Sequence, residues 1–544
     1  MVGAVFSASA HADAMRKGGF WVDRLFDDYL MDAIATVPDK PAIVADSGGQ
    51  VRRFSYRELG DMVARAAASL RRLGIGRGDI VAMQSPTWWE AVVATFACAR
   101  IGAVLNPLMP IFRERELTFM LGFAEAKTFI VPKVFNNFDF ETMALGLRKD
   151  IPSLKHVIVM RGDGANAFEA CLLGGSERLE ADALAGEAVP RPDELSILMY
   201  TSGTTGSPKG VMHTANTMLC GMNNVAARGK LTRDDVILAC APIGHMIGFG
   251  TGVLISVRLG ATVVLQESWN GRRAVELILA EGVTFAAGAT PYLSDICDAA
   301  AGSEKKPRTL RLFLCAGAPI PPALIERARR DLNLRVTSVW GMTETLANTM
   351  TEPELAFEKS PKTDGRALAG SEVQVVDNDG KPVPNGIVGR LMVRGAQTFM
   401  GYYQRPDIQP FDADGWMDTG DLAFMDDEGY IRIAGRTKDV IIRGGENVPV
   451  ADVENVLYEH PAVLGVAVVG YPDARLGERA CAFVQLRPGQ RFDFALMQEH
   501  LASKRVAKQF WPERLEVVDA LPRTPSGKIQ KFPLRDKAKE FGAA

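Results

Sequence analysis

The sequence contains 544 residues, of which 47% are hydrophobic and 23% are charged. At roughly 100–200 residues per domain, this length predicts more than one globular unit, and the apolar fraction excludes a largely disordered chain. The 62 Lys and Arg residues nearly balance the 65 Asp and Glu residues, and the formal charge of −3 argues against nucleic acid as a main partner.

The middle of the chain alternates between short apolar runs and amphipathic helical stretches. The predicted strands are Thr262–Leu265, Val283–Ala289, Leu310–Cys315 and Arg335–Val339, and the predicted helices are Arg272–Glu281, a helix from Pro291, and Pro321–Asp331. Such alternation is typical of parallel strands covered by helices. Ligands of these sheets bind at the carboxyl ends of the strands, where loops lead into helices.

The pattern changes after Gly365, where turn motifs recur at short intervals. They separate the predicted strands Glu372–Val376 and Arg390–Val393, which indicates a small antiparallel sheet or β-barrel. After Gly435, alternating helices and strands predict a compact α+β unit of about 100 residues. Its predicted elements are Val450–His460, Leu464–Val469, Ala480–Leu486 and Phe494–Arg505.

We therefore predict an α/β protein with two domains. The large N-terminal domain, residues 1–436, combines helix-covered parallel sheets with a small antiparallel β-barrel, and the small C-terminal domain, residues 437–544, is α+β.

Other sequence patterns indicate the cellular compartment of the protein. No apolar run reaches the roughly 18–20 residues that a membrane-spanning helix needs, and residues 1–11 lack the basic flank and apolar core of a signal peptide. The seven cysteines are scattered singly, and the six histidines form no HExxH pattern. We therefore expect a cytoplasmic protein with reduced thiols, no membrane span and no histidine-based metal site.

The strongest local motif is the run Tyr200–Gly210, which follows the apolar run Leu195–Met199 and precedes a predicted helix. Its glycines and hydroxyl side chains suit a loop that presents backbone N–H and hydroxyl donors to phosphate oxygens, and a lysine adds charge. It lacks the spacing of a Walker A loop. Taken alone, it could also be a surface linker. The candidate residues are Thr201, Ser202, Gly203, Thr204, Thr205, Gly206 and Lys209.

This loop resembles the phosphate loop of the adenylate-forming superfamily of acyl-CoA synthetases, adenylation domains and luciferases. Four further motifs follow in the order that the family has: Trp340–Thr345, Thr419–Asp421, Gly435–Asp439 and Pro522–Lys528. Leu314–Gly317 and Gly288–Pro291 make the chain most similar to the short- and medium-chain or alicyclic (cyclohexanecarboxylate-type) acyl-CoA ligases.

The resemblance implies a ligase that uses ATP, Mg²⁺ and coenzyme A. A carboxylic acid would first give acyl-AMP and pyrophosphate, and acyl-AMP would then give acyl-CoA and AMP. A free carboxylate has a pKa of about 4 and is ionised at neutral pH, so the first step needs no general base. The task is electrostatic, because negative charge must be brought onto a triphosphate and stabilised.

Roles for the nucleotide-binding residues follow from the resemblance. Glu344 would hold Mg²⁺ and Thr343 would donate to the α-phosphate, although a threonine there could simply cap a helix. Asp421 would accept both ribose hydroxyls, although it could be an ordinary turn residue. Arg436 would assist both the nucleotide and the hinge.

The adenine is expected between Trp340 and the turn Gly317-Ala318-Pro319, next to Gly341 and Met342. The family usually has Tyr where this chain has Trp340, so the stacking face is kept and any hydrogen bond of the Tyr hydroxyl is lost. Trp340 could also be a plain core residue.

The resemblance implies a mobile C-terminal domain. Lys528 would reach the acyl carboxylate and the α-phosphate in the first step, although composition alone would make it a basic tail residue. Rotation about a hinge at Lys438 would then remove Lys528 and bring Arg443-Gly444-Gly445 to line a pantetheine tunnel. The paired glycines suit a narrow tunnel but could form an ordinary turn.

The acyl pocket is expected around His245, as a substrate-positioning residue, although a lone His in an apolar run is more often a core residue. Gly248, Gly250, Gly252 and Gly288 are expected to leave volume for an apolar acid of some width. One departure from the family is Arg390, which stands where Glu is common in the Gly-Glu-Leu that precedes Arg394-Gly395; the sequence gives no physical account of it.

Two alternatives remain open from the sequence. The chain could transfer acyl groups to a separate carrier protein, although Arg443 and the two glycines after it favour free coenzyme A. It could also be a catalytically silent nucleotide sensor, against which Lys528, Glu344 and Asp421 argue. The expected partners are a small carboxylic acid, ATP and coenzyme A, together with a second copy of the chain in a homodimer.

Overall fold

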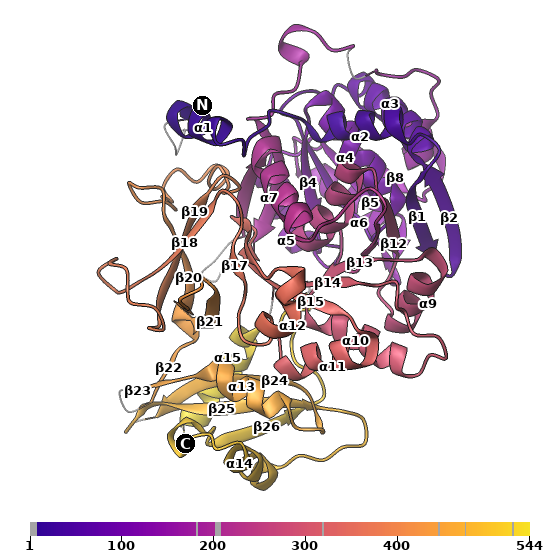
Figure 1. Ribbon diagram of the computed structural model, residues 1–544. Coiled ribbons are helices and arrows are strands. Elements are labelled where there is room, and N and C mark those ends of the chain that lie inside the picture. The colour runs from indigo at the N-terminus through magenta and orange to yellow at the C-terminus, as the bar shows by residue number, and fades with distance from the viewer. Residues whose placement is uncertain are drawn as a thin grey trace.

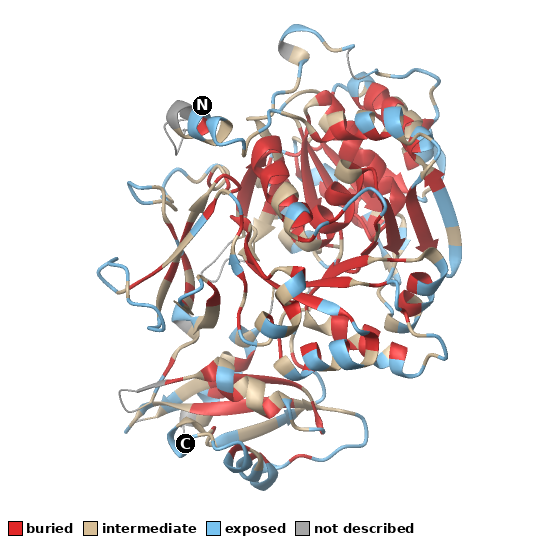
Figure 2. Cartoon of the chain, in the orientation of Figure 1, coloured by how far each residue is buried: buried red, intermediate tan, exposed pale blue. Residues whose placement is uncertain are grey.

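The computed structural model describes residues 8–180, 183–201, 208–317, 320–443, 446–473, 475–524 and 527–543. Figure 1 shows a large body built on two sheets, a small antiparallel sheet beside it, and a C-terminal unit below both, in orange to yellow. Buried residues concentrate on the strands and inner helices of the large body (Figure 2).

In the described residues, nine strands form the first sheet of the large body, in the order β17-β16-β15-β14-β13-β11-β12-β1-β2. The strands from β15 to β1 are parallel, and antiparallel strands close both edges. Their bounds are β1 Pro41–Ser47, β2 Gln50–Ser55, β11 Val236–Ala239, β12 Thr262–Gln266, β13 Phe285–Gly288, β14 Leu312–Ala316, β15 Arg335–Met342, β16 Leu346–Met350 and β17 Arg366–Ala367.

The second sheet has the order β10-β9-β4-β3-β5-β8, and its strands are parallel except for β10. Their bounds are β3 Ile80–Gln84, β4 Val104–Leu108, β5 Thr128–Pro132, β8 His156–Met160, β9 Leu195–Thr201 and β10 Lys209–Thr214. A short hairpin, β6 Val134–Phe135 and β7 Phe138–Asp139, follows β5.

Helices fill the space between the two sheets and cover their outer faces. The bounds are α1 Ala8–Lys17, α2 Phe26–Thr36, α3 Tyr56–Arg72, α4 Trp89–Ile101, α5 Glu114–Phe123, α6 Phe140–Asp150, α7 Ala215–Arg228, α8 Ile255–Leu259, α9 Gly271–Glu281, α10 Thr290–Ala301, α11 Pro322–Leu332 and α12 Ala356–Lys359. Side chains of α2, α3, α4, α7 and α8 share one core with both sheets, whereas α9 to α11 and α5 with α6 cover the opposite faces.

Local sequence explains these elements. On β3, Val81 and Met83 face the central core, whereas Ile80 and Ala82 face α5 and α6, as the two-residue period of a strand requires. A capping box begins α3, because the Ser55 hydroxyl accepts the Glu58 N–H at 3.2 Å and the Glu58 carboxylate accepts the Ser55 N–H at 2.7 Å.

A buried ion pair fastens two of the inner helices. Arg100 on α4 donates to both carboxylate oxygens of Asp27 on α2, at 2.8 and 3.0 Å. Their side chains are 2% and 5% exposed. Burial raises the pKa of Asp27, and the hydrogen bond to Arg100 opposes that change. Each partner therefore offsets the cost of burying the other.

The small sheet and the C-terminal unit have separate cores. The small sheet has the order β18-β19-β20-β21, and the sheet of the C-terminal unit is built on the antiparallel pair β24–β25. The bounds are β18 Ser371–Val376, β19 Gly389–Gly395, β20 Met417–Met425, β21 Ile431–Arg436, β22 Ile441–Arg443, β23 Glu446–Val448, β24 Val463–Asp473, β25 Gly477–Leu486, β26 Arg514–Val518, α13 Val450–Tyr458, α14 Phe494–Ser503 and α15 Lys531–Lys539.

The structure confirms the predicted α/β class, the parallel strands between Thr262 and Gly341 and the α+β C-terminal unit, with element ends within four residues. The expected small antiparallel unit is also present, and its ladders join the described strands as an open path from β18 to β21. One detail was wrong: the residues after the phosphate-loop motif form strand β10, and a helix begins only at Ala215. Within the described ranges, no helix has both the length and the apolar character that crossing a bilayer requires.

Candidate active site

The phosphate-loop motif joins two antiparallel strands. Thr201 at the end of β9 pairs with Lys209 at the start of β10, so the pairing brings both ends of the loop together. Between them, the predicted phosphate ligands Ser202, Gly203, Thr204, Thr205 and Gly206 lie outside the described residues. The strands therefore fix where the loop starts and where its lysine stands.

Glu344 lies on the turn between β15 and β16, and it is 6% exposed. Gly341 precedes this turn, and a Cβ there would collide with the Leu346 carbonyl, so the bend requires glycine. Burial raises the pKa of Glu344, whereas hydrogen bonds from its own backbone and from Tyr402, and the charge of Lys209, act in the opposite direction. The carboxylate is thus buried, and nearby donors and a cation favour its charged form.

Asp421 on β20 accepts hydrogen bonds from two side chains that come from different parts of the chain. The Trp340 indole Nε1–H donates to one carboxylate oxygen at 2.9 Å, and Arg436 Nε donates to the other at 2.9 Å. Trp340 is 8% exposed and packs in the core of the small sheet beside Val211. The indole N–H therefore supplies a polar contact in place of the Tyr hydroxyl, while adenine stacking remains a prediction.

Arg390, which had no explanation in the sequence, supports the same strand. Its Nη1 donates to Asp418 at 2.6 Å, three residues before Asp421, and two further nitrogens donate to the Asp377 carbonyl. Arg390 thus ties β19 to β20 close to the carboxylate that the motif supplies.

Lys528 of the C-terminal unit reaches the large body. A Cβ placed at Gly317 would lie 3.9 Å from Lys528 Cε, and Gly317 has a φ of +84°, a conformation that favours glycine. The pKa of Lys528 is lowered to about 8, mainly by burial and then by the charge of Arg436, while the charges of Asp421 and Glu344 act in the opposite direction. Residues from four separate motifs therefore share one electrostatic environment.

His245 belongs to the same environment. Burial lowers the pKa of its imidazole to about 4, with the charge of Lys528 as a second cause. Its Nδ1 accepts the Ile247 N–H at 3.2 Å. The ring is therefore neutral at pH 7, which fits a positioning role better than proton transfer.

The C-terminal unit docks on α10. A Cβ added at Gly527 would lie 3.2 Å from Pro291 Cγ, and the Tyr458 side chain is hydrogen-bonded to Ser294. Burial lowers the pKa of Arg523, which is near Asp295 and Tyr458. This contact sets the position from which Lys528 extends.

Among the residues expected to form the pantetheine tunnel, Arg443 is described, and it does not contact this site. Arg443 on β22 contacts Glu513 and the Gln509 carbonyl, both in the C-terminal unit. Gly444, Gly445, Ala318 and Pro319 lie outside the described residues, as does the side chain of Lys438. The backbone of Lys438 forms a single turn, Thr437–Asp439, directly after β21.

The expectation that glycines leave volume beside His245 was wrong. These glycines belong to or face Ile247–Leu254, which is wound as a π-helix, a form often found at functional sites. A Cβ at Gly248 would collide with the Ala241 and Pro242 carbonyls, one at Gly250 would meet Met222 at 2.8 Å, and one at Gly252 would meet Ala239 at 2.9 Å. At Gly288 it would meet the Tyr292 ring at 2.8 Å. The glycines instead allow neighbouring backbone and side chains to pack closely against them.

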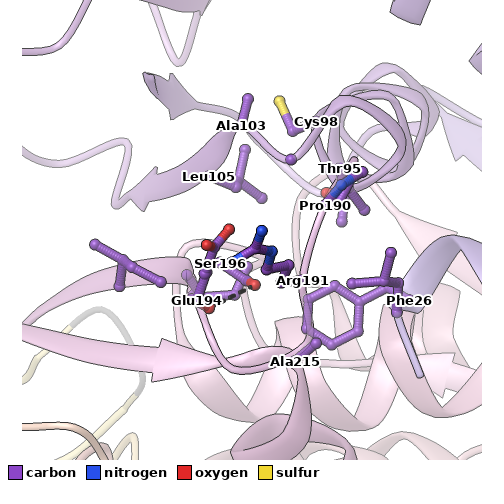
Figure 3. Close-up of a pocket in the computed structure, with 15 residues that line it drawn as sticks. Phe26, Thr95, Cys98, Ala103, Leu105, Pro190, Arg191, Glu194, Ser196 and Ala215 are labelled. Carbon is purple, nitrogen blue, oxygen red and sulfur yellow. Dashed lines mark hydrogen bonds between the residues drawn. The ribbon is translucent and has the colours of Figure 1, made fainter. Parts of the chain in front are cut away.

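A pocket elsewhere in the body is formed by α4, β4, β9 and the loop before β9. Figure 3 shows Phe26, Cys98, Leu105 and Arg191 around it, and none of the predicted site residues lines it. We assign it no part in the chemistry.

Comparison with known proteins decides the family. Residues 30–403 match the AMP-binding enzyme family, and residues 452–528 match the AMP-binding enzyme C-terminal domain. The chain belongs to the AMP-binding enzyme family.

The chain resembles several AMP-binding enzymes along nearly its whole length. It is 37% identical over 529 residues to a medium-chain fatty-acid–CoA ligase of Escherichia coli, covering 96% of this chain and 92% of that protein. It is 35% identical over 531 residues to a salicyl-AMP ligase / salicyl-S-ArCP synthetase of Mycobacterium tuberculosis, covering 96% and 92%. The solved anthranilate CoA ligase AuaEII, in complex with anthranoyl-AMP, matches with a TM-score of 0.87 at 25% identity, covering 96% and 99%.

Two residues at the site of this AMP-binding enzyme were not predicted from the sequence. Tyr402 donates its hydroxyl to Glu344 at 3.0 Å, and His213 lies 2.7 Å from the Thr343 carbonyl. Neither belongs to a motif that the sequence singled out, and both contacts span at least 58 positions. Only the pairing of distant strands brings them to the site.

Replacing Trp340 by Phe should raise the KM for ATP about tenfold. The ring remains, but Asp421 loses the N–H that orients it, and a hydrogen bond to a charged group contributes about 1.5 kcal/mol or more. Steady-state kinetics with varied ATP would measure the change. Trp416→Phe, directly before β20 of the small sheet, is the control, and an equal effect in both variants would contradict the specific role.

The pH dependence of adenylation should report the Lys528 ammonium. Its pKa of about 8 means that the cation is present at neutral pH and is lost as the pH rises above 8. Because kcat/KM reports ionisations of the free enzyme, kcat/KM for pyrophosphate release should fall on that side. Lys528→Arg, which stays charged, should lack this falling limb; a limb that persists would assign it to another group.

Proposed function

We propose that this AMP-binding enzyme is an acyl-CoA ligase, which activates an apolar carboxylic acid with ATP and transfers the acyl group to coenzyme A. The observation that carries the proposal is the position of Lys528 over Gly317, in the electrostatic environment of Asp421 and Glu344. Two anions must meet there, and a cation from a separately packed unit supplies the opposite charge.

The residues of the site can hold Mg²⁺. Within the described ranges, no three His, Cys, Asp or Glu side chains gather to hold a metal ion. Magnesium is commonly held by one or two carboxylates together with phosphate oxygens and water, and Glu344 is a buried carboxylate of that kind. Bound there, Mg²⁺ would neutralise charge on the phosphates.

In the first step, a carboxylate oxygen of the acid attacks the α-phosphorus of ATP and pyrophosphate leaves. Lys528 holds the two anions together, Thr343 and the backbone of residues 201–209 donate to phosphate oxygens, and Asp421 holds the ribose. No residue has to remove a proton, because the acid is already ionised. The neutral ring of His245 positions the acid.

In the second step, the sulfur of coenzyme A attacks the acyl carbonyl carbon, the thiol proton is released, and AMP leaves. We assign the position of Lys528 beside Gly317 to the first step. We propose that the C-terminal domain, residues 437–544, rotates about Lys438, so that Arg443-Gly444-Gly445 replace Lys528 there.

The proposed acid is a medium-chain or alicyclic one. The π-helix after His245 is apolar apart from Thr251, whose hydroxyl donates to the Ile247 carbonyl and is therefore occupied. The Escherichia coli relative, named for medium-chain fatty acids, is similar over nearly the whole chain. Both observations favour an acid without charge beyond its carboxylate.

A screen for pyrophosphate release over C2–C12, cyclohexanecarboxylic and benzoic acids, with and without coenzyme A, tests the proposal. We expect release that depends on both ATP and a medium-chain or alicyclic acid, and acyl-CoA when coenzyme A is added. No pyrophosphate release with any of these acids would leave the chain as a nucleotide-binding protein without this activity.

A second candidate function is transfer of the acyl group to a carrier protein. The Mycobacterium tuberculosis relative, named as both a salicyl-AMP ligase and a salicyl-S-ArCP synthetase, supports this candidate with 35% identity. Acyl-adenylate that accumulates with the preferred acid, without consumption of coenzyme A, would favour it over the proposed function.

A further inference from the structure

A segment that no motif covers pairs through backbone hydrogen bonds with the outer edge of the phosphate-loop hairpin. Met400 N–H donates to the Met212 carbonyl at 2.8 Å, Met212 N–H donates to Gly401 at 3.2 Å, and Tyr403 N–H donates to Gly210 at 2.8 Å. Tyr402 is thereby placed opposite Val211 on β10. The strand that leaves the phosphate loop thus fixes the backbone of Tyr402.

The side chain of Tyr402 lies between the two charged groups of the site. Its hydroxyl donates to Glu344 Oε1 at 3.0 Å, and Lys209 Nζ stands 4.9 Å from the centre of its ring. The tyrosine therefore contacts both the cation that ends the phosphate loop and the carboxylate assigned to the metal.

The backbone of the Glu344 turn is held by the same segment and by β10. Phe399 N–H donates to the Glu344 carbonyl at 2.8 Å, and the buried His213 on β10 lies 2.7 Å from the Thr343 carbonyl through Nε2. Burial lowers the pKa of His213 to about 4, so the ring is neutral and donates one N–H. With the backbone fixed at both residues, the remaining freedom is the rotation of the Glu344 side chain.

We propose that Tyr402 is a positioning residue that orients the Glu344 carboxylate toward the metal–nucleotide complex. The inference rests on the proposed function, in which Glu344 holds Mg²⁺. A carboxylate offers about four acceptor positions, so the bond to Tyr402 restricts its rotation and leaves positions for a cation. Hydrogen bonds to metal-ligating carboxylates are typically worth 10- to 100-fold in metal affinity or activity.

The test compares Tyr402→Phe with Tyr403→Phe. Each removes one hydroxyl from the same segment, but Tyr403 packs on Phe123 and points away from Glu344. Binding of Mn²⁺ with a non-hydrolysable ATP analogue is measured by electron paramagnetic resonance, and pyrophosphate release is measured against Mg²⁺ concentration. We expect Tyr402→Phe to bind Mn²⁺ at least about tenfold more weakly and to need correspondingly more Mg²⁺, and Tyr403→Phe to match the parent.

Saturating Mg²⁺ should restore most of the rate of Tyr402→Phe, which would not happen if the variant were misfolded. Thioester formation from supplied acyl-adenylate, which needs no triphosphate, should stay unchanged. Parent-like Mn²⁺ affinity in Tyr402→Phe would overturn the inference while leaving the proposed function intact. A parent protein that releases no pyrophosphate with any acid would instead remove the proposed function.

Discussion

Replacing Lys528 by Met should slow acyl-adenylate formation about 100- to 1000-fold, the range for removing a charged or oxyanion-stabilising donor from an active site. The ammonium stands over Gly317 and shares its environment with Asp421 and Glu344. Without it, the carboxylate and the α-phosphate would meet with no opposing charge. Pyrophosphate exchange measures the first step directly, and thioester formation from supplied acyl-adenylate measures the second, which should be spared.

Lys531→Met provides the matched control. Lys531 lies three residues further along the same basic segment and forms an ion pair with Glu454 within the C-terminal unit, at 2.7 Å. Both steps should be close to normal in this variant. If Lys528→Met formed adenylate at the parent rate, the proposed first step would have to be abandoned.

The second large effect should appear in stability. Arg100→Met is expected to lower the free energy of unfolding by about 3–5 kcal/mol, because it leaves the Asp27 carboxylate buried without its partner. Chemical denaturation followed by circular dichroism would measure the change. The shift in the denaturation midpoint should exceed that of a surface variant many times over.

Two comparisons make this result specific. The double variant Asp27→Leu with Arg100→Met removes both charges and should recover much of the loss, since apolar replacements of buried ion pairs are often neutral. Arg405→Met breaks an exposed pair with Asp407 and should cost less than about 1 kcal/mol. A single Arg100 variant as stable as the Arg405 variant would contradict the assigned role of the buried pair.

Much of the fold could be predicted because its signals are local. The strands between Thr262 and Gly341 are short apolar runs separated by helices with one apolar face, and each pattern is readable within a window of about ten residues. The motifs around Glu344, Asp421 and Lys528 could also be found, because their residue types are unusual in their local context. Their convergence was implied only by the family resemblance.

The rest depended on packing between distant segments. Nothing in the sequence near Gly248 indicates that the Ala241 and Pro242 carbonyls occupy the place of its missing side chain. Tyr402 approaches Glu344 only because residues 400–403 add to β10. A glycine signals that a side chain is absent, but only the folded chain shows whether solvent, substrate or backbone fills the space.

The bond between Trp340 and Asp421 links β15 of the large body to the small sheet, and Lys528 brings the C-terminal unit to the same site. Each of these three parts has its own apolar interior. A nucleotide bound among them would join parts that could otherwise melt independently, and its binding energy would add to the cohesion of the whole chain. Bound ATP would then stabilise the contacts among the three parts before it reacts. The release of pyrophosphate and AMP would remove that stabilisation before the next turnover.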